Sequence, residues 1–209
     1  MRASPPRRPA IALAITGASG AQYALRLLEC LIEAQRDVYL MISQPGQVVI
    51  GMETDLALPG RPAEMERFLT DHYRAQPGQI SVFGRDQWTA PVASGSGAPE
   101  AMVLCPCTTG TLSAVAVGAS RSLLERAADV VLKERKKLIV VLRETPLSEI
   151  HLTNMLTLAR AGAIIMPANP GFYHQPGSVE DLVDFVVARI LDHLHVEHAI
   201  IRRWGNGSQ

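Results

Sequence analysis

The chain has 209 residues, of which 47% are hydrophobic and 19% are charged, a composition that can fold around one sizeable core. Lysine plus arginine equals aspartate plus glutamate at 20 each, so overall charge gives no support to nucleic-acid binding. No apolar run reaches the roughly 18 residues that span a bilayer, so we expect no membrane segment. We predict a flexible leader over residues 1–10, one domain over 11–204 and a short tail over 205–209.

Apolar runs of strand length recur along the chain and alternate with helical patterns. The runs cover residues 11–15, 38–42, 101–105, 138–142 and 163–166, and the helical patterns cover 22–34, 62–73, 123–133, 149–161 and 179–194. Ser122 with Glu125, and Ser178 with Asp181, have the spacing of capping boxes, and Gly162 suits a helix C-terminus. This alternation predicts an α/β fold with three layers, in which helices cover both faces of a mostly parallel sheet.

The segment from about residue 53 to 99 has less regular patterning. It ends in the tetrad SGSG at residues 94–97, whose composition suits either a passive linker or a loop shaped around a ligand. Both interpretations stay open from the sequence.

The stretch TGASG at residues 16–20 follows the first predicted strand and opens a helix. At the carboxyl end of a parallel strand, the helix dipole and the backbone N–H groups favour an anion. Gly17 and Gly20 permit a tight turn, while Thr16 and Ser19 add hydroxyl donors. The alternative is a plain strand-to-helix turn with Ser19 as its cap.

Missing features narrow the choice of anion. The dinucleotide fingerprint G-x-G-x-x-G is absent, and the second predicted strand ends at Ser43 rather than at an acidic residue. These observations disfavour NAD and favour a mononucleotide. A second hydroxyl-rich turn, CTTGT at residues 107–111, follows the third predicted strand and supports the same site, although it also suits a threonine-capped helix start.

The three cysteines, Cys30, Cys105 and Cys107, lack partners at the spacing of a zinc site. We therefore expect reduced thiols, no metal and a cytoplasmic protein.

Several segments together resemble the UbiX-type flavin prenyltransferases of the flavin-containing cysteine decarboxylase superfamily. They are TGASGAQY, SGSGAP, CPCTTGTLSAVA, ERAADVVLKER, LRETPLS, NMLTLARAGAIIMPANPGFYHQP and SVEDLVDFVVARILD. The resemblance implies a flavodoxin-like Rossmann subunit assembled as trimers within a dodecamer, with FMN at subunit interfaces. The implied reaction moves a dimethylallyl group from dimethylallyl phosphate to N5 and C6 of reduced FMN. The implied product is prenylated FMN, the cofactor of a UbiD-type decarboxylase in ubiquinone biosynthesis.

The resemblance also implies a role for individual residues. FMN contacts would come from Gly17, Ala18, Ser19, Ser43, Thr108, Thr109, Gly110, Thr111 and Arg143. The prenyl donor would meet Tyr173 and Arg189, with Lys133 nearby and Trp88 and Trp204 at the prenyl pocket. Catalytic or site-lining positions would be Ser19, Glu53, Ser94, Arg126 and Glu144.

Ionising an allylic phosphate leaves negative charge on the departing phosphate. The chain has no Asp-rich magnesium motif, so arginine and lysine side chains would have to stabilise that charge. Two alternatives remain: a flavin-dependent decarboxylase of cysteinyl substrates, and a non-catalytic FMN carrier.

Overall fold

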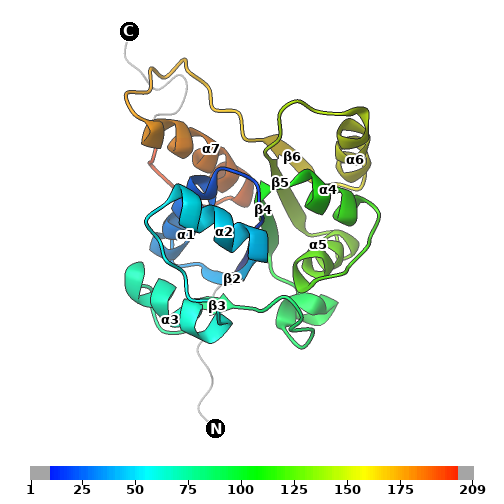
Figure 1. Ribbon diagram of the computed structural model, residues 1–209, viewed down its shortest axis with the longest axis horizontal. Coiled ribbons are helices and arrows are strands. Elements are labelled where there is room, and N and C mark those ends of the chain that lie inside the picture. The colour runs from blue at the N-terminus through cyan, green and yellow to red at the C-terminus, as the bar shows by residue number, and fades with distance from the viewer. Residues whose placement is uncertain (1–9, 202–209) are drawn as a thin grey trace.

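Six parallel strands form the centre of the fold in the computed structural model, which describes residues 10–201 (Figure 1). The strands are β1 (Ala10–Ile15), β2 (Asp37–Ile42), β3 (Ile80–Val82), β4 (Ala101–Cys107), β5 (Lys137–Leu142) and β6 (Ile164–Pro167). They lie in the order β3-β2-β1-β4-β5-β6, and each strand is parallel to its neighbours. The predicted α/β flavodoxin-like fold is confirmed, with a sheet that is wholly rather than mostly parallel.

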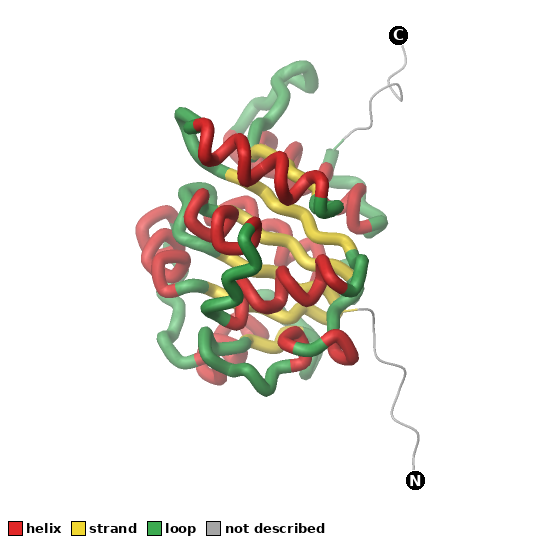
Figure 2. Tube along the Cα trace, turned by 90° about the vertical axis from the view of Figure 1, so that its right-hand side faces the viewer, coloured by secondary structure: helices red, strands yellow, loops and turns green. Residues whose placement is uncertain are grey.

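Helices cover both faces of this sheet, as Figure 2 shows for the central layer of strands. One core contains side chains from α1 (Ala21–Glu33), α2 (Gln44–Glu53), α3 (Pro62–His72) and α7 (Val179–Leu194). The other contains side chains from α4 (Thr109–Ala116), α5 (Leu123–Lys133) and α6 (Glu149–Arg160). Strand β1 serves both, since Ile11 and Leu13 enter the first core and Ala12 and Ala14 the second. Burial on both faces explains the continuous apolar runs.

Of the two predicted capping boxes, one is complete and one is not. Ser178 and Asp181 form a complete capping box at the start of α7. At the start of α5, the Ser122 hydroxyl accepts from the Glu125 N–H, but the Glu125 carboxylate accepts from the Arg121 N–H instead of completing the box. Gly162 follows α6 with φ of 101°, the left-handed conformation that suits a helix C-terminus.

The irregular segment is more ordered than its sequence indicates. Helix α2 and strand β3 were not predicted, because α2 contains Pro45 and two glycines and β3 has only three residues. The tetrad SGSG is not a passive linker: it forms one of two 3₁₀ turns, η1 (Pro91–Ala93) and η2 (Gly95–Gly97). A Cβ on Gly97 would lie 2.6 Å from the Pro91 carbonyl oxygen, so two stretches of backbone pack closely here.

The strand order reverses between β1 and β4. From β1 the chain proceeds outward through β2 to β3, and from β4 it proceeds the other way through β5 to β6. The loops after β1 and β4 are therefore neighbours at the carboxyl edge of the sheet, where parallel α/β proteins bind ligands. Within the described residues, none of the helices combines the length and apolar character that crossing a bilayer demands.

Candidate active site

Thr16 joins the two hydroxyl-rich loops. Its hydroxyl donates to the Pro106 carbonyl at 2.7 Å and accepts from the Thr108 N–H at 2.9 Å. Thr16 is 2% exposed, so both hydrogen bonds of its hydroxyl are made inside the protein. The expectation that this hydroxyl adds a donor for an anion is wrong, because its hydrogen is already committed to Pro106.

Glu53, at the end of α2, caps the start of α1. Its carboxylate accepts from the N–H groups of Gly20 and Ala21 at 2.8 and 2.9 Å. Gly20 is the N-cap residue in a left-handed conformation, and no side-chain cap comes from the loop itself. The interpretation of Ser19 as the cap is thus wrong. The backbone N–H groups of Gly20 and Ala21, which the sequence pattern predicted as donors to a bound anion, therefore donate to this carboxylate instead.

The surroundings of Glu53 keep its carboxylate charged. Burial by itself raises the pKa, but hydrogen bonding from the Ser19 side chain and from Ala21 and Gly20, with the positive charge of Arg143, lowers it below the ordinary value. Ser19, Glu53 and Arg143 therefore lie in one electrostatic neighbourhood.

The loop after β5 reaches the same edge. The Arg143 N–H donates to the Cys107 carbonyl at 3.2 Å, and the Thr109 hydroxyl donates to the Glu144 carboxylate at 3.4 Å. Tyr23, from the first turn of α1, also lies here: burial and then Cys105 raise its pKa, and the Arg143 charge partly offsets them. Residues from the ends of β1, β4 and β5 thus converge.

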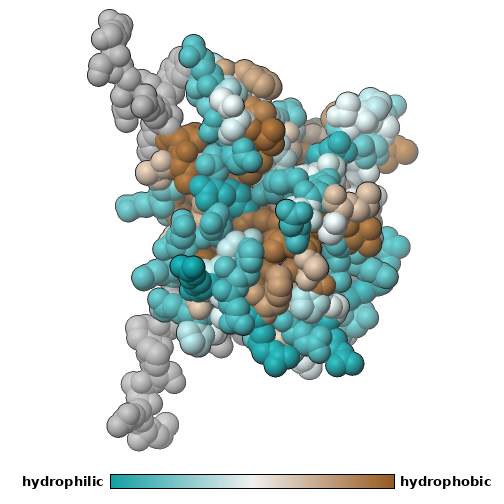
Figure 3. All heavy atoms as spheres, turned by 60° about the vertical axis from the view of Figure 1, so that its left-hand side comes forward, coloured by the Kyte–Doolittle hydropathy of each residue, from teal (hydrophilic) through white to brown (hydrophobic). Residues whose placement is uncertain are grey.

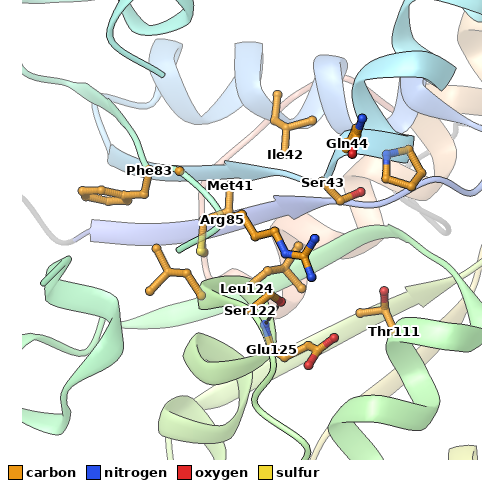
Figure 4. Close-up of a pocket in the computed structure, with 13 residues that line it drawn as sticks. Met41, Ile42, Ser43, Gln44, Phe83, Arg85, Thr111, Ser122, Leu124 and Glu125 are labelled. Carbon is orange, nitrogen blue, oxygen red and sulfur yellow. Dashed lines mark hydrogen bonds between the residues drawn. The ribbon is translucent and has the colours of Figure 1, made fainter. Parts of the chain in front are cut away.

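A cavity of about 320 Å³ lies beside these loops, between α2, α4 and α5. Ser43 and Thr111 line it together with Arg85 and the first turn of α5 (Figure 4). Ser43 caps α2 by accepting from the Gly46 N–H, and Thr108 caps α4 by accepting from the Thr111 N–H at 3.1 Å. The threonine-capped helix start is therefore correct, and the same loop also faces a cavity.

A second group of predicted residues lies on α5 and beside the two 3₁₀ turns, and none of them lines this cavity. Arg126 donates to the Ala93 carbonyl at 3.2 Å and pairs with Asp129 at 2.8 Å. Lys133 pairs with Glu134 beside Gly95. Ser94 joins η1 to η2 in the same region. The preceding segment carries Trp88, which is 48% exposed.

A third group lies on α7 and the loop before it. The Tyr173 ring packs edge-on against Phe185 at 5.7 Å. Arg189 follows Phe185 by one helical turn and pairs with Asp192 at 2.7 Å. Within one chain the structure does not bring Arg189 to the loops after β1 and β4, because α7 runs toward the amino edge of the sheet, where Lys137 of β5 donates to the His193 carbonyl. Trp204 lies outside the described residues.

The three cysteines are free and buried. Burial raises the pKa of Cys107 to about 12, and burial with the neighbouring Cys107 raises that of Cys105, so neither is a reactive thiolate near neutral pH. In residues 10–201, no three His, Cys, Asp or Glu side chains gather as a metal site would require.

Two residues at this edge were missed by the sequence reasoning, Tyr23 and Arg85. Arg85 follows β3, a strand too short to recognise in the sequence. The sequence therefore gives no sign that Arg85 lies at the carboxyl edge of the sheet. In the sequence, Tyr23 looks like one more apolar residue of α1. It lies at the site because the packing of α1 places the first turn of the helix there.

Comparisons with known proteins agree with this geometry. The flavoprotein family model matches residues 3–191. Flavin prenyltransferase UbiX of Pseudomonas aeruginosa is 62% identical over 195 residues, which cover 93% of each chain. The UbiX of Halalkalibacterium halodurans is 46% identical over 91% of each chain.

Two solved structures are similar throughout. AnUbiX (PadA1), in complex with FMN and dimethylallyl pyrophosphate, has a TM-score of 0.85 and 39% identity, covering 97% of this chain and 100% of its own. A dodecameric FMN-dependent UbiX-like decarboxylase from Escherichia coli O157:H7 has a TM-score of 0.83 and 36% identity, covering 94% and 100%. The chain accordingly belongs to the flavoprotein family, as a member of its UbiX-type flavin prenyltransferases.

Proposed function

We propose that the protein transfers a dimethylallyl group from dimethylallyl phosphate to N5 and C6 of reduced FMN, producing prenylated FMN. Family membership at 62% identity supports the reaction class. The structural observation that carries the proposal is the convergence of Ser19, Glu53 and Arg143 at the reversal point of the sheet, beside a cavity lined by Ser43 and Thr111.

The residues at the carboxyl edge fit FMN. The cavity offers hydroxyl groups from Ser43, Thr111 and Ser122 beside apolar side chains of Met41 and Phe83, a mixture that suits a phosphorylated polyol chain. The proposed FMN-binding set is Gly17, Ala18, Ser19, Ser43, Thr108, Thr109, Gly110, Thr111 and Arg143. When bound in its reduced form, FMN would supply the electron-rich N5 and C6, which bond to two different carbons of the prenyl group.

Cationic side chains act on the prenyl donor. In this proposal Tyr173 and Arg189 bind the phosphate of the donor, and Lys133 and Arg126 add positive charge as the carbon–oxygen bond breaks. The proposal also assigns Trp88, and Trp204 outside the described residues, to the prenyl pocket, where an aromatic face would stabilise the allylic cation by about 0.5–2 kcal/mol.

These cations require a second copy of the chain. Lys133 and Arg189 lie on α5 and α7, away from the loops that carry Ser19 and Arg143. We propose that neighbouring copies supply them, in trimers within a dodecamer. The dodecameric relative supports this assembly, and Figure 3 shows apolar side chains gathered at the surface of one face. On α6, Ile150 and Leu152 are also exposed.

Carboxylate and hydroxyl side chains accept and relay the protons that leave the flavin. Glu53, held ionised by its surroundings, can accept a proton that Ser19 relays from the position of N5. Glu144, hydrogen-bonded to Thr109, is the second candidate acceptor. We further propose that a neighbouring copy supplies Ser94 to the site, together with Lys133.

One anaerobic experiment tests the function. Purified protein, reduced FMN and dimethylallyl phosphate should give a flavin heavier by one C5 unit in a mass spectrum. A parallel incubation with dimethylallyl pyrophosphate tests the choice of donor, since AnUbiX was solved with that compound. Unchanged flavin mass in both incubations would refute the proposal.

The same preparation separates the two alternatives. Release of carbon dioxide from a peptide with a C-terminal cysteine would favour the decarboxylase, and bound FMN without any turnover would favour the carrier. On the strength of the family resemblance, we further propose a cytoplasmic location and delivery of the product to a UbiD-type decarboxylase in ubiquinone biosynthesis.

A further inference from the structure

Arg85, on the loop after β3, lies at the opening of the cavity that Ser43 and Thr111 line, and its side chain is 73% exposed. Figure 4 shows its guanidinium in the opening, with Ser43 on one side and Thr111, Ser122 and Glu125 on the other. These residues come from four different elements, so the cavity depends on the tertiary fold.

The backbone of Arg85 is held from both sides. The Leu123 N–H at the start of α5 donates to the Arg85 carbonyl at 2.8 Å. Two residues earlier, the Phe83 N–H donates to the Leu40 carbonyl at 2.9 Å, and the Phe83 ring meets Tyr39 edge-on at 5.6 Å. The loop therefore presents Arg85 from an anchored position.

The charge of Arg85 has little internal compensation. Its recorded ion pair, with Asp86, spans 4.0 Å, whereas Arg126 and Arg189 meet their carboxylates at 2.8 and 2.7 Å. Glu125 also lines the cavity, but its carboxylate accepts from the Arg121 N–H at 2.7 Å. Among the described residues that line this cavity, Arg85 carries the positive charge.

We propose that Arg85 binds the phosphate group of FMN, with the hydroxyls of Ser43 and Thr111 donating to the same group. This inference rests on the proposed function, which makes FMN the flavin. A phosphate monoester carries between one and two negative charges near neutral pH and needs a cation when it leaves water. A guanidinium supplies that charge with paired donors.

The test compares FMN with riboflavin, which lacks the phosphate. Dissociation constants are measured by flavin fluorescence for the wild type, Arg85→Ala, Arg85→Lys and a control, Arg121→Ala. The control removes an exposed arginine near the start of α5 that does not line the cavity. Arg85→Ala should weaken FMN binding by about tenfold to a hundredfold and leave riboflavin binding within about twofold. Arg85→Lys should lose less, and Arg121→Ala should change neither.

The outcomes separate this inference from the proposed function. Equal weakening of FMN and riboflavin, or unchanged FMN affinity in Arg85→Ala, would overturn the role of Arg85 while the wild type still prenylates FMN. A wild type that binds FMN no better than riboflavin would also overturn it. A wild type that binds FMN through Arg85 but leaves its mass unchanged with both donors would overturn only the proposed function.

Discussion

The side-chain oxygen of Thr16 accepts a hydrogen bond from the Thr108 N–H at 2.9 Å, linking two residues 92 positions apart in the sequence. The same oxygen donates to the Pro106 carbonyl. One buried hydroxyl thus sets the distance between the loops that carry Ser19 and Thr109.

Thr16→Val keeps the shape of this side chain and removes its hydroxyl. The Thr108 N–H then loses its acceptor, which should destabilise the protein by about 1–3 kcal/mol and weaken FMN binding as the second loop shifts. Thr16→Ser retains the hydroxyl and should restore the affinity. Urea unfolding and flavin titration measure the two effects, and an unchanged affinity in Thr16→Val would contradict the positioning role.

Glu53→Gln should make folding less sensitive to acid. The folded pKa of Glu53 is lowered, so in the acid range the unfolded chain binds more protons at this group. The resulting stability is present above the ordinary glutamate pKa and is lost as the pH falls through the lowered value. The variant keeps an oxygen that can accept from the Gly20 and Ala21 N–H groups, so near pH 7 it should lose only about 1 kcal/mol, the difference between hydrogen bonds to a charged and to a neutral acceptor.

Denaturant unfolding at neutral and acid pH measures this change. Asp55→Asn, which removes an exposed carboxylate two residues away, serves as the control. A pH dependence of stability in Glu53→Gln that matches the wild type would count against the cap.

Gly17→Ala should displace the first loop. The added Cβ would lie 2.4 Å from Cβ of Pro45, so α2 or the loop must move, at a cost of about 1–3 kcal/mol. Gly51→Ala in α2 meets nothing within 4 Å and should instead stabilise the helix by about 0.5–1 kcal/mol. Thermal unfolding compares the two, and similar shifts in both variants would exclude the close approach.

Arg143→Ala should weaken the binding of FMN and of the prenyl donor by roughly tenfold or more, because a cation at the site is lost. Cys107→Ser should keep most of the activity. Its hydroxyl can donate to the Thr108 carbonyl as the buried thiol does at 3.4 Å, with a modest loss of stability. Steady-state kinetics on both variants provide the check, and equal losses would contradict the assigned roles.

Ile150→Glu should disrupt assembly without unfolding the chain. Ile150 is 71% exposed on α6, where a charge costs little in a single chain and much in an apolar contact between copies. Light scattering on a sizing column should give a smaller mass than for the wild type. Ala63→Glu adds the same charge on α3 and should leave the mass unchanged.

The sequence predicted the strands and helices with strong periodicity, because burial on both faces of the sheet leaves continuous apolar runs. It did not predict β3 or α2. In β3 three residues are too few for a pattern, and α2 depends on the Ser43 cap and on Pro45 rather than on an apolar stripe.

The two loops after β1 and β4 were recognised from local composition, because glycines and hydroxyls at the carboxyl end of a parallel strand suit an anion site. The role of each side chain in these loops could be seen only in the folded structure. The Thr16 hydroxyl is bonded inside the protein, Glu53 of α2 caps α1, and Arg85 lines the cavity opening from the loop after β3. Hydrogen bonds between residues far apart in the chain leave no periodic trace in the sequence.

The sequence by itself therefore determined the fold class, the family and the chemical character of the site, because burial pattern and residue type are local properties of the chain. Only the tertiary structure decided which hydroxyls, carboxylates and guanidinium groups are already paired and which face the cavity. That distinction depends on distances across the sheet, which are set when the strands pack.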